Sequence, residues 1–354
     1  MPHAIAAREL QFAEQLLARL QNASHHIIFS YPQLIGDMPN LPSPLITHLP
    51  AFLPLELTRP ATSHSLINYE EQYSLPLAPT EGVSGGTTLL ANQAKCPFRA
   101  LAAHRLHASS GPDISSGPDA SERGQVLHQV MEILWKRLGS QQQLLSLTTP
   151  VLNEYIEHAI ITALESLTQN RPLSFSHLIQ EVEFSRIKRL ILTCLDWEKQ
   201  RSPFVIESLE QTFTIELAGI HFKVRIDRLD NVGPDKKWVI DYKSSMPVNK
   251  PWNEDRPEAP QLLLYALLDQ SINALLFVQL NAGQLKCSGL SEDQLPIKGI
   301  STMKKNEQWR DNQQHWHQQL TELAHEFRTG FCPPRPSRAS ICTRCEFQNL
   351  CRIE

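Results

Sequence analysis

The chain lacks the features that would assign it at once to a membrane, secreted or nucleic-acid-coating class. Between Met1 and Leu20 the apolar residues are interrupted by Arg8, Glu9, Glu14 and Arg19, so neither a signal-peptide core nor a membrane span forms there. An excess of positive charge is also missing, because the formal net charge is -4. Bulk attraction to nucleic acid requires many unpaired Lys and Arg. We therefore expect a cytoplasmic protein with no membrane association, in which contact with nucleic acid depends on a local groove.

Two further absences narrow the class. The glycine-containing stretch 82–88 lacks the lysine of a phosphate-binding loop, so no ATPase motor is indicated in this chain. The seven cysteines are an odd number in a chain without an export signal. This composition argues against a disulfide framework and favours a metal or cluster site.

The N-terminal quarter differs in composition from the rest. The stretch 31–80 is rich in proline and short apolar runs, and proline interrupts both helices and sheet ladders. We expect an irregular segment over residues 1–88, the remnant of a larger helicase-like region, and a folded domain over residues 89–354. The 354 residues suffice for one large core or two modest ones.

The hydrophobic periodicity changes along the folded domain. Helical spacing dominates first, short β-branched and aromatic runs follow, and helix and strand then alternate. The expected helices are 123–138, 151–168, 178–199, 261–268 and 307–327. The expected strands are 204–206, 213–215, 222–226, 238–240 and 274–280. This order predicts an α/β fold with a mixed sheet flanked by helices.

Two acidic residues and a lysine stand at the ends of two of these strands. Asp227 ends one expected strand, Asp241 ends another, and Lys243 follows Asp241 by two residues, so both point to one face. Carboxylates brought together repel each other unless a cation lies between them, and the lysine can orient a water or stabilise an oxyanion. The alternative is an Asp-Lys surface pair at a strand end.

Four motifs carry a resemblance to a known family. They are Gly124-x-x-x-His128, Ile226-Asp227-Arg228 with Asp230, Ile240-Asp241-Tyr242-Lys243, and Pro260-Gln261-x-x-x-Tyr265. With these motifs, most of residues 89–354 resembles the nuclease domain of the RecB and AddB helicase-nucleases, within the PD-(D/E)XK superfamily. The resemblance implies a restriction-endonuclease-like fold.

The resemblance also implies roles for individual residues: magnesium or manganese ligation by His128, Asp227 and Asp241, catalysis by Asp227, Asp241 and Lys243, and support of the active site by Gln261 and Tyr265. Each has an alternative interpretation. A lone histidine on an apolar helix face is usually a core residue, and Gln261 and Tyr265, four residues apart, are equally suited to anchoring a helix to the sheet. Glu210 lies where the family often has a glutamate, without an assigned role.

Two charged runs elsewhere have simpler explanations. The run Asp196-Trp197-Glu198-Lys199 lies in a helical stretch, and we expect it to form a solvated helix face. Arg186, Lys188 and Arg189 are candidates for a basic lining that contacts DNA, although such a run is more often a solvated face.

The cysteines near the two ends of the folded domain form a pattern. Cys342, Cys345 and Cys351 are closely spaced, and Cys96 stands far upstream. In the resembling nucleases, one early and three late cysteines hold a structural four-iron four-sulfur cluster. A four-cysteine zinc site is the alternative, because spacing alone does not distinguish tetrahedral thiolate sites.

These patterns support two functional hypotheses. The first is a metal-dependent nuclease that hydrolyses phosphodiester bonds of single-stranded or unwound DNA in repair or recombination, working alone or with a separate helicase subunit. The second is a non-catalytic DNA-binding or scaffold module that retains the nuclease fold.

Overall fold

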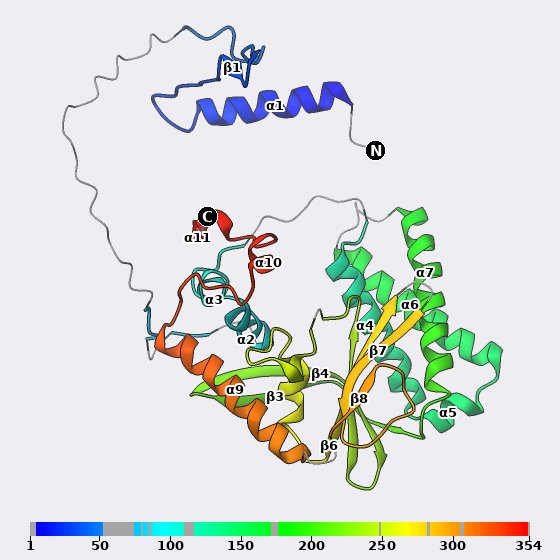
Figure 1. Ribbon diagram of the computed structural model, residues 1–354. Coiled ribbons are helices and arrows are strands. Elements are labelled where there is room, and N and C mark those ends of the chain that lie inside the picture. The colour runs from blue at the N-terminus through cyan, green and yellow to red at the C-terminus, as the bar shows by residue number, and fades with distance from the viewer. Residues whose placement is uncertain are drawn as a thin grey trace. The chain divides into compact units, whose positions relative to one another are not determined.

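The computed structural model describes residues 5–51, 74–78, 81–83, 86–109, 117–170, 176–247, 249–281, 284–304 and 308–352 (Figure 1). Contacts divide the chain into two compact units, Met1–Glu70 and Glu71–Glu354. Residues Leu75 and Leu77 hydrogen-bond to the main-chain oxygens of Gly330 and Arg328, so this part of the expected N-terminal segment packs on the larger unit. The domain boundary at residue 88 stays a prediction.

The described residues of the smaller unit, 5–51, form one helix and a short hairpin. Helix α1 spans Ala6–Gln21, and the two-residue strands β1 (Leu34–Ile35) and β2 (Met38–Pro39) pair across a turn that contains Gly36. Helix α1 lies within the segment expected to be irregular, because the proline-rich composition begins only after it; the helix itself contains strong helix formers and no proline. Residues 52–73 and 79–80 of the proline-rich stretch lie outside the described residues.

The larger unit is built on a mixed sheet, six-stranded within the described residues, with strand order β3-β4-β5-β6-β7-β8. Neighbouring strands are antiparallel except for the parallel pairs β5–β6 and β7–β8. This confirms the predicted mixed α/β fold. The strands are β3 (Val205–Leu217), β4 (Ile220–Gly233), β5 (Lys236–Lys243), β6 (Ile272–Asn281), β7 (Gln284–Ser291) and β8 (Ile300–Thr302).

The strands are longer than the apolar runs predicted. Two expected strands, 204–206 and 213–215, are parts of the single strand β3, because the polar residues between them also pair with β4. Strands β7 and β8 were not predicted; β7 contains a glycine and no β-branched residue, so it lacks the usual strand signal.

Helices cover both faces of the sheet (Figure 1). One hydrophobic core joins a sheet face to α4, α6 and α7, and the other joins the opposite face to α2, α8 and α9. The helices of this unit are α2 (Gly86–Lys95), α3 (Pro97–His104), α4 (Ala120–Leu138), α5 (Gln141–Ser146), α6 (Thr149–Asn170), α7 (His177–Glu198), the 3-10 turn η1 (Pro251–Asn253), α8 (Gln261–Ala266), α9 (Trp309–Thr329), α10 (Ala339–Cys342) and α11 (Gln348–Cys351).

Helix α4 has well-defined ends that hold it over the sheet. Asp119 caps its first turn by accepting from the backbone N–H of Glu122, whose side chain in turn accepts from the backbone N–H of Asp119. Gly139, in the left-handed region with φ 67°, ends the helix. Of the helices in the described ranges, α4 included, none is long and apolar enough to cross a membrane.

Candidate metal centre

Strand β4 changes phase at the predicted acidic residue. Its side chains alternate between buried and exposed as far as Ile226, after which every residue to Asp230 is buried. Ile226 and Leu229 pack into the same core although they lie three residues apart. Regular alternation would place them on opposite faces. The irregularity therefore occurs at Asp227 and Arg228, and both charged side chains are buried there.

Strand β3 changes phase beside it, at Glu210. Leu209 packs on the α4 side of the sheet and Phe213 on the α9 side, although an even spacing would keep them on one face. Glu210 has φ 48°, in the left-handed region that disfavours residues with a side chain. The register of β3 with β4 places Glu210 opposite Asp227.

The acidic residues of three strands thus form a row across the sheet. Continuing the register of β4 with β5 by one residue places Asp227 opposite Asp241. The main-chain N–H of Tyr242 donates to Oδ2 of Asp227 at 2.9 Å, which holds these two strands together at this position. Glu210, Asp227 and Asp241 therefore concentrate negative charge where the strands diverge from regular pairing.

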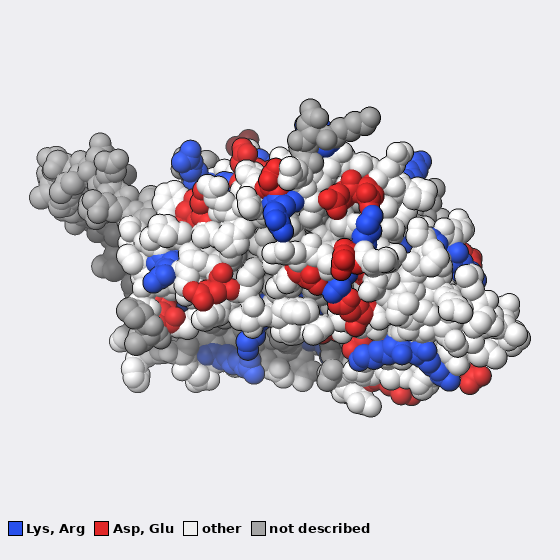
Figure 2. All heavy atoms as spheres, turned by 90° about the horizontal axis from the view of Figure 1, so that it is seen from below, with Lys and Arg blue, Asp and Glu red and all other residues white. Residues whose placement is uncertain are grey.

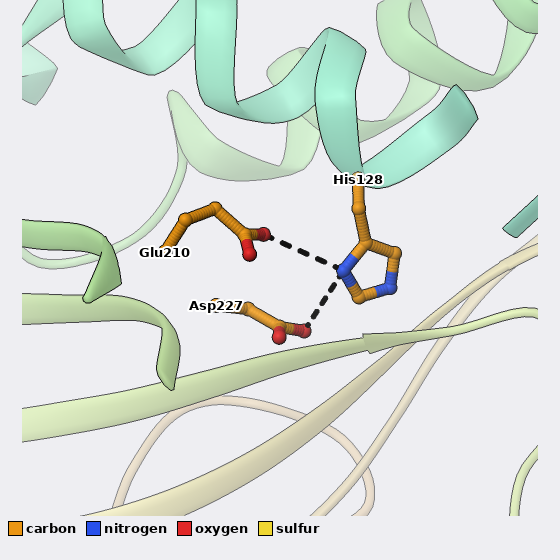
Figure 3. Close-up of side chains that lie close together, drawn as sticks. All are labelled: His128, Glu210 and Asp227. Atoms are coloured by element: carbon orange, nitrogen blue, oxygen red, sulfur yellow. Dashed lines mark ion pairs between the residues drawn. The ribbon is translucent and has the colours of Figure 1, made fainter. Parts of the chain in front are cut away.

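His128 of α4 completes a compact group with two of these acids (Figure 3). Its Nδ1 atom lies 3.6 Å from Oε1 of Glu210 and 3.4 Å from Oδ2 of Asp227. Among the described residues, these three offer ligand atoms that all lie within 4.8 Å of one another. Nε2 of His128 lies 2.9 Å from the carbonyl oxygen of Tyr242, to which it donates. Nδ1 is therefore directed at the carboxylates, where it holds either a proton or a cation.

The pKa values reflect this concentration of charge. Burial and the neighbouring Asp241 carboxylate raise the pKa of Asp227 from 3.8 to about 7. Burial alone would lower the pKa of His128, but the hydrogen bond to Glu210 and the charges of Asp227 and Asp241 outweigh it and raise the pKa from 6.5 to about 9. The site thus retains protons that a divalent cation would displace.

Asp241 and Lys243 lie next to this group. Asp241 is fully buried, and burial raises its pKa against the opposing effect of the Lys243 ammonium. Nζ of Lys243 lies 2.7 Å from Oδ2 of Asp241, whereas Oδ1 has no hydrogen-bond partner in the described part of the chain. An unsatisfied buried carboxylate oxygen is costly, and it is suited to accept a cation or a water. Asp241 is not part of the three-residue group, which contains Glu210 instead, and its role as a metal ligand stays a prediction.

Helix α8 contacts Lys243 through Gln261. Oε1 of Gln261 accepts from Nζ of Lys243 at 2.8 Å, and Nε2 of Gln261 donates to the Tyr265 hydroxyl at 2.6 Å. That hydroxyl donates to the main-chain oxygen of Arg225 on β4. Gln261 and Tyr265 share one helix face, as their spacing predicts, and connect α8 to the lysine and to β4.

A buried ion network lies directly behind the acidic row. Arg228 donates to both oxygens of Asp230, at 2.6 and 2.8 Å, to Glu198 at 2.6 Å and to the Tyr242 hydroxyl at 2.9 Å. Arg201 bonds to Glu198 at 2.6 Å and to Asp230 at 2.8 Å. These two arginines and two carboxylates are almost completely excluded from solvent and balance one another's charge.

This network corrects one prediction about the run 196–199. Asp196 and Lys199 do form an exposed ion pair, 3.0 Å apart. Glu198, however, has no exposed surface. The interpretation of the run as a solvated helix face is wrong for Glu198, because α7 ends beside the sheet and its last residue points inward to the arginines.

Two of the three basic residues of α7 that were candidates for contacting DNA form ion pairs instead. Arg186 pairs with the buried Glu183 at 2.7 Å, and Lys188 pairs with Glu157 at 2.7 Å. Figure 2 shows Lys and Arg in separate groups with Asp and Glu between them on the face displayed. Charge of one sign does not dominate that face, which agrees with the negative net charge.

The four cysteines come from both ends of the larger unit. Burial raises the pKa of the Cys96 thiol, and the nearby Cys351 acts in the same direction. The Arg99 guanidinium lies 3.6 Å from the Cys345 sulfur. Across the described ranges, however, no three cysteine sulfurs lie within 4.8 Å of one another.

The larger unit thus combines a mixed α/β sheet flanked by helices with a candidate metal site of two carboxylates and a histidine. A sequence model of the PD-(D/E)XK nuclease superfamily matches residues 88–352, and the chain belongs to that superfamily. Comparison with curated proteins gives no match. The chain is also similar to a solved structure titled "Crystal structure of SSO0001", with 14% sequence identity and a TM-score of 0.25, over 74% of this chain and 94% of that one.

Proposed function

We propose that this protein is a magnesium- or manganese-dependent nuclease that hydrolyses phosphodiester bonds of single-stranded or unwound DNA. The observation that carries the proposal is the group formed by His128, Glu210 and Asp227, with Asp241 and Lys243 beside it. Superfamily membership supports metal-dependent phosphodiester hydrolysis and a nucleic acid substrate. A decayed scaffold would have no need to retain a lysine paired with a buried acid at this position.

The residues present fit a hard divalent cation. Such ions prefer oxygen ligands and keep several waters, and the unsatisfied Oδ1 of Asp241 and the carboxylates of Glu210 and Asp227 offer oxygens. His128 presents Nδ1, which its hydrogen bond to the β5 backbone orients. A bound cation would polarise the scissile phosphate and lower the pKa of a water.

The remaining residues position the reacting groups. Lys243 places an ammonium beside Asp241, where it orients a water or stabilises negative charge that develops at phosphorus. Gln261 accepts from that ammonium and restricts its orientation. Tyr265 connects the amide of Gln261 to the β4 backbone, so a shift of α8 would move the lysine.

Three finer features of the proposal rest on the motifs quoted above. These are a RecB- or AddB-like nuclease domain, a role in repair or recombination, and cooperation with a separate helicase subunit. The resemblance in His128, Asp227, Asp241, Lys243 and the α8 motif supports them. Residues 1–88 would then be the remnant of a helicase-like region.

The test of the nuclease is hydrolysis of a labelled single-stranded oligonucleotide with magnesium or manganese. Lys243→Ala and Asp241→Asn should each lower the cleavage rate by about 10²–10³-fold and retain oligonucleotide binding. Asp196→Asn on the surface of α7 is the matched control and should cleave at the wild-type rate. Wild-type cleavage by either site variant would refute the assignment, and failure of the wild-type protein to cleave would favour the scaffold hypothesis.

A four-iron four-sulfur cluster held by Cys96, Cys342, Cys345 and Cys351 is the second part of the proposal. Zinc–thiolate bonds of about 2.3 Å in a tetrahedron bring sulfurs to about 3.8 Å from one another. No three sulfurs of the described cysteines lie within 4.8 Å of one another. A cluster binds its thiolates on separate irons, and the Arg99 guanidinium beside Cys345 is a donor of the kind that stabilises a thiolate.

The cluster proposal is tested on anaerobically purified protein. Wild-type protein should show brown absorbance with matching iron and sulfide content, and Cys345→Ser should lose all three and unfold at a lower temperature. Cys287→Ser, on β7, should retain them. Stoichiometric zinc without iron would contradict the proposal.

A further inference from the structure

Neither the backbone conformation of α4 nor the packing of described atoms around it requires a glycine at Gly124. It lies one helical turn before His128, on the same face, and its φ is not in the left-handed region. A Cβ atom added there would meet no described atom within 4 Å. Glycine inside a helix is less favourable than alanine because it loses more backbone entropy. The missing side chain therefore leaves space that no described residue of the chain fills.

That space opens onto a groove over the metal centre. Gly124 lines a cavity of about 560 Å³ together with His128 and Glu210, and Arg225 and Ser244 line it from the sheet side. The other side chains that α4 contributes are mostly polar, namely Ser121, Gln125, Gln129 and Glu132. A cavity of this size lies in the range that encloses one small ligand.

Basic residues continue from the groove along the exposed face of β4. Arg225 and Lys223 alternate with buried residues and lead toward Asp227. The Arg225 side chain is 66% exposed and lies 2.9 Å from Glu210. Lys223 forms no ion pair with any residue in the described ranges and lies about 7 Å beyond Arg225 along the strand. The opposing strand presents Thr212 and Thr214, whose hydroxyls offer hydrogen bonds.

We propose that this groove binds the sugar–phosphate backbone of one strand of nucleic acid. Gly124 lets the strand approach the backbone of α4, and Arg225 and Lys223 neutralise the phosphates next to the one cleaved. The acidic row alone would repel phosphate, so the two cationic side chains and a bound metal act together. The inference rests on the proposed nuclease function and adds the path of its substrate.

Binding can be measured separately from cleavage. Calcium, which also takes oxygen ligands, replaces magnesium, and fluorescence anisotropy follows a short labelled oligothymidylate. Gly124→Leu should weaken binding about tenfold or more and leave the melting temperature unchanged or higher. Gly124→Ala should have a smaller effect in the same direction. Lys223→Gln should weaken binding and lower the salt dependence by about one phosphate contact.

A matched control and a small substrate separate this inference from the proposed function. Lys236→Gln, at an exposed ion pair with Asp293, makes the same charge change away from the groove and should bind like wild type. The wild-type protein should hydrolyse bis(p-nitrophenyl) phosphate with magnesium, which tests the metal centre without a nucleic acid strand in the groove. Wild-type oligonucleotide binding by Gly124→Leu, or no binding by the wild-type protein, would overturn the inference. Binding without magnesium-dependent cleavage would instead refute the nuclease.

Discussion

The main chain of Tyr242 contacts His128 and also Asp227, two of the three residues that form the candidate metal site. The carbonyl oxygen of Tyr242 accepts from Nε2 of His128 at 2.9 Å, and its N–H donates to Asp227 at 2.9 Å. One residue of β5 therefore orients a helix side chain and a strand side chain toward the same point. The Tyr242 hydroxyl is in turn held by Arg228 in the buried network. Residues that hydrogen-bond to metal ligands usually support metal affinity, so replacing such a residue lowers the affinity.

Glu210 should contribute to metal affinity. Its carboxylate belongs to the group that also contains His128 and Asp227. Glu210→Gln keeps the size of the side chain and removes its charge, so we expect the dissociation constant for manganese to rise by about 10–100-fold, measured by isothermal titration. Glu207→Gln, three residues earlier on β3 and paired with Lys237, is the control and should bind as wild type does. Equal affinity of both variants would exclude Glu210 as a ligand.

The metal-free protein should lose stability as the pH rises. The folded state raises the pKa of Asp227 from 3.8 to about 7 and that of His128 from 6.5 to about 9. In both intervals the folded protein binds more protons than the unfolded chain, so the contribution of each group falls as the pH increases through the interval. A magnesium ion bound at this site would replace these protons, so adding magnesium should restore the stability.

This pH dependence is measured as the increase in melting temperature on adding magnesium. The increase should be larger near pH about 8.5 than near pH about 5.5, where protons compete with the metal. For a domain of this size, each kcal/mol corresponds to about 2–4 °C. An increase that is equal at both pH values, or larger at the lower one, would show that the metal does not displace these protons.

Arg228 should be essential for the stability of the larger unit. Arg228→Met leaves Glu198 and Asp230 buried with only Arg201 to balance them. Removing one member of a buried ion network costs about 3–5 kcal/mol, which urea denaturation can measure. Lys199→Met, which breaks the exposed pair with Asp196, should cost about 1 kcal/mol or less. A similar loss in both variants would mean that the network contributes little to stability.

Local patterns were sufficient for much of the fold. The helices α4, α6, α7, α8 and α9 and the strands β4, β5 and β6 were predicted from the period of their apolar residues, because burial of one face imposes that period. The shorter elements α2, α3, α5, α10, α11, β7 and β8 of the larger unit were missed. Their sequences are too short, or too poor in β-branched residues, to show a period of their own.

The candidate site was only partly accessible from the sequence. Asp241 and Lys243 were expected to share one face, and they lie 2.7 Å apart. Glu210 was noticed by its position alone, because its place in the group depends on its left-handed backbone and on the residue opposite it. Glu198 was misinterpreted, because a helical pattern does not reveal which arginines of distant strands face the end of the helix.

The sequence by itself determined the chemical groups and the local elements that carry them: the acids, the lysine, the histidine, the cysteines, and the helices and strands with a clear period. Only the tertiary structure decided which of these groups meet. The phase changes at Glu210 and Asp227 and the convergence of α4 with three strands arise from pairing between residues far apart in the chain. Such pairing is stabilised when strands distant in sequence bury their apolar faces together, and this burial also sets the register between them. Neither property can be read from the immediate neighbours of any one residue.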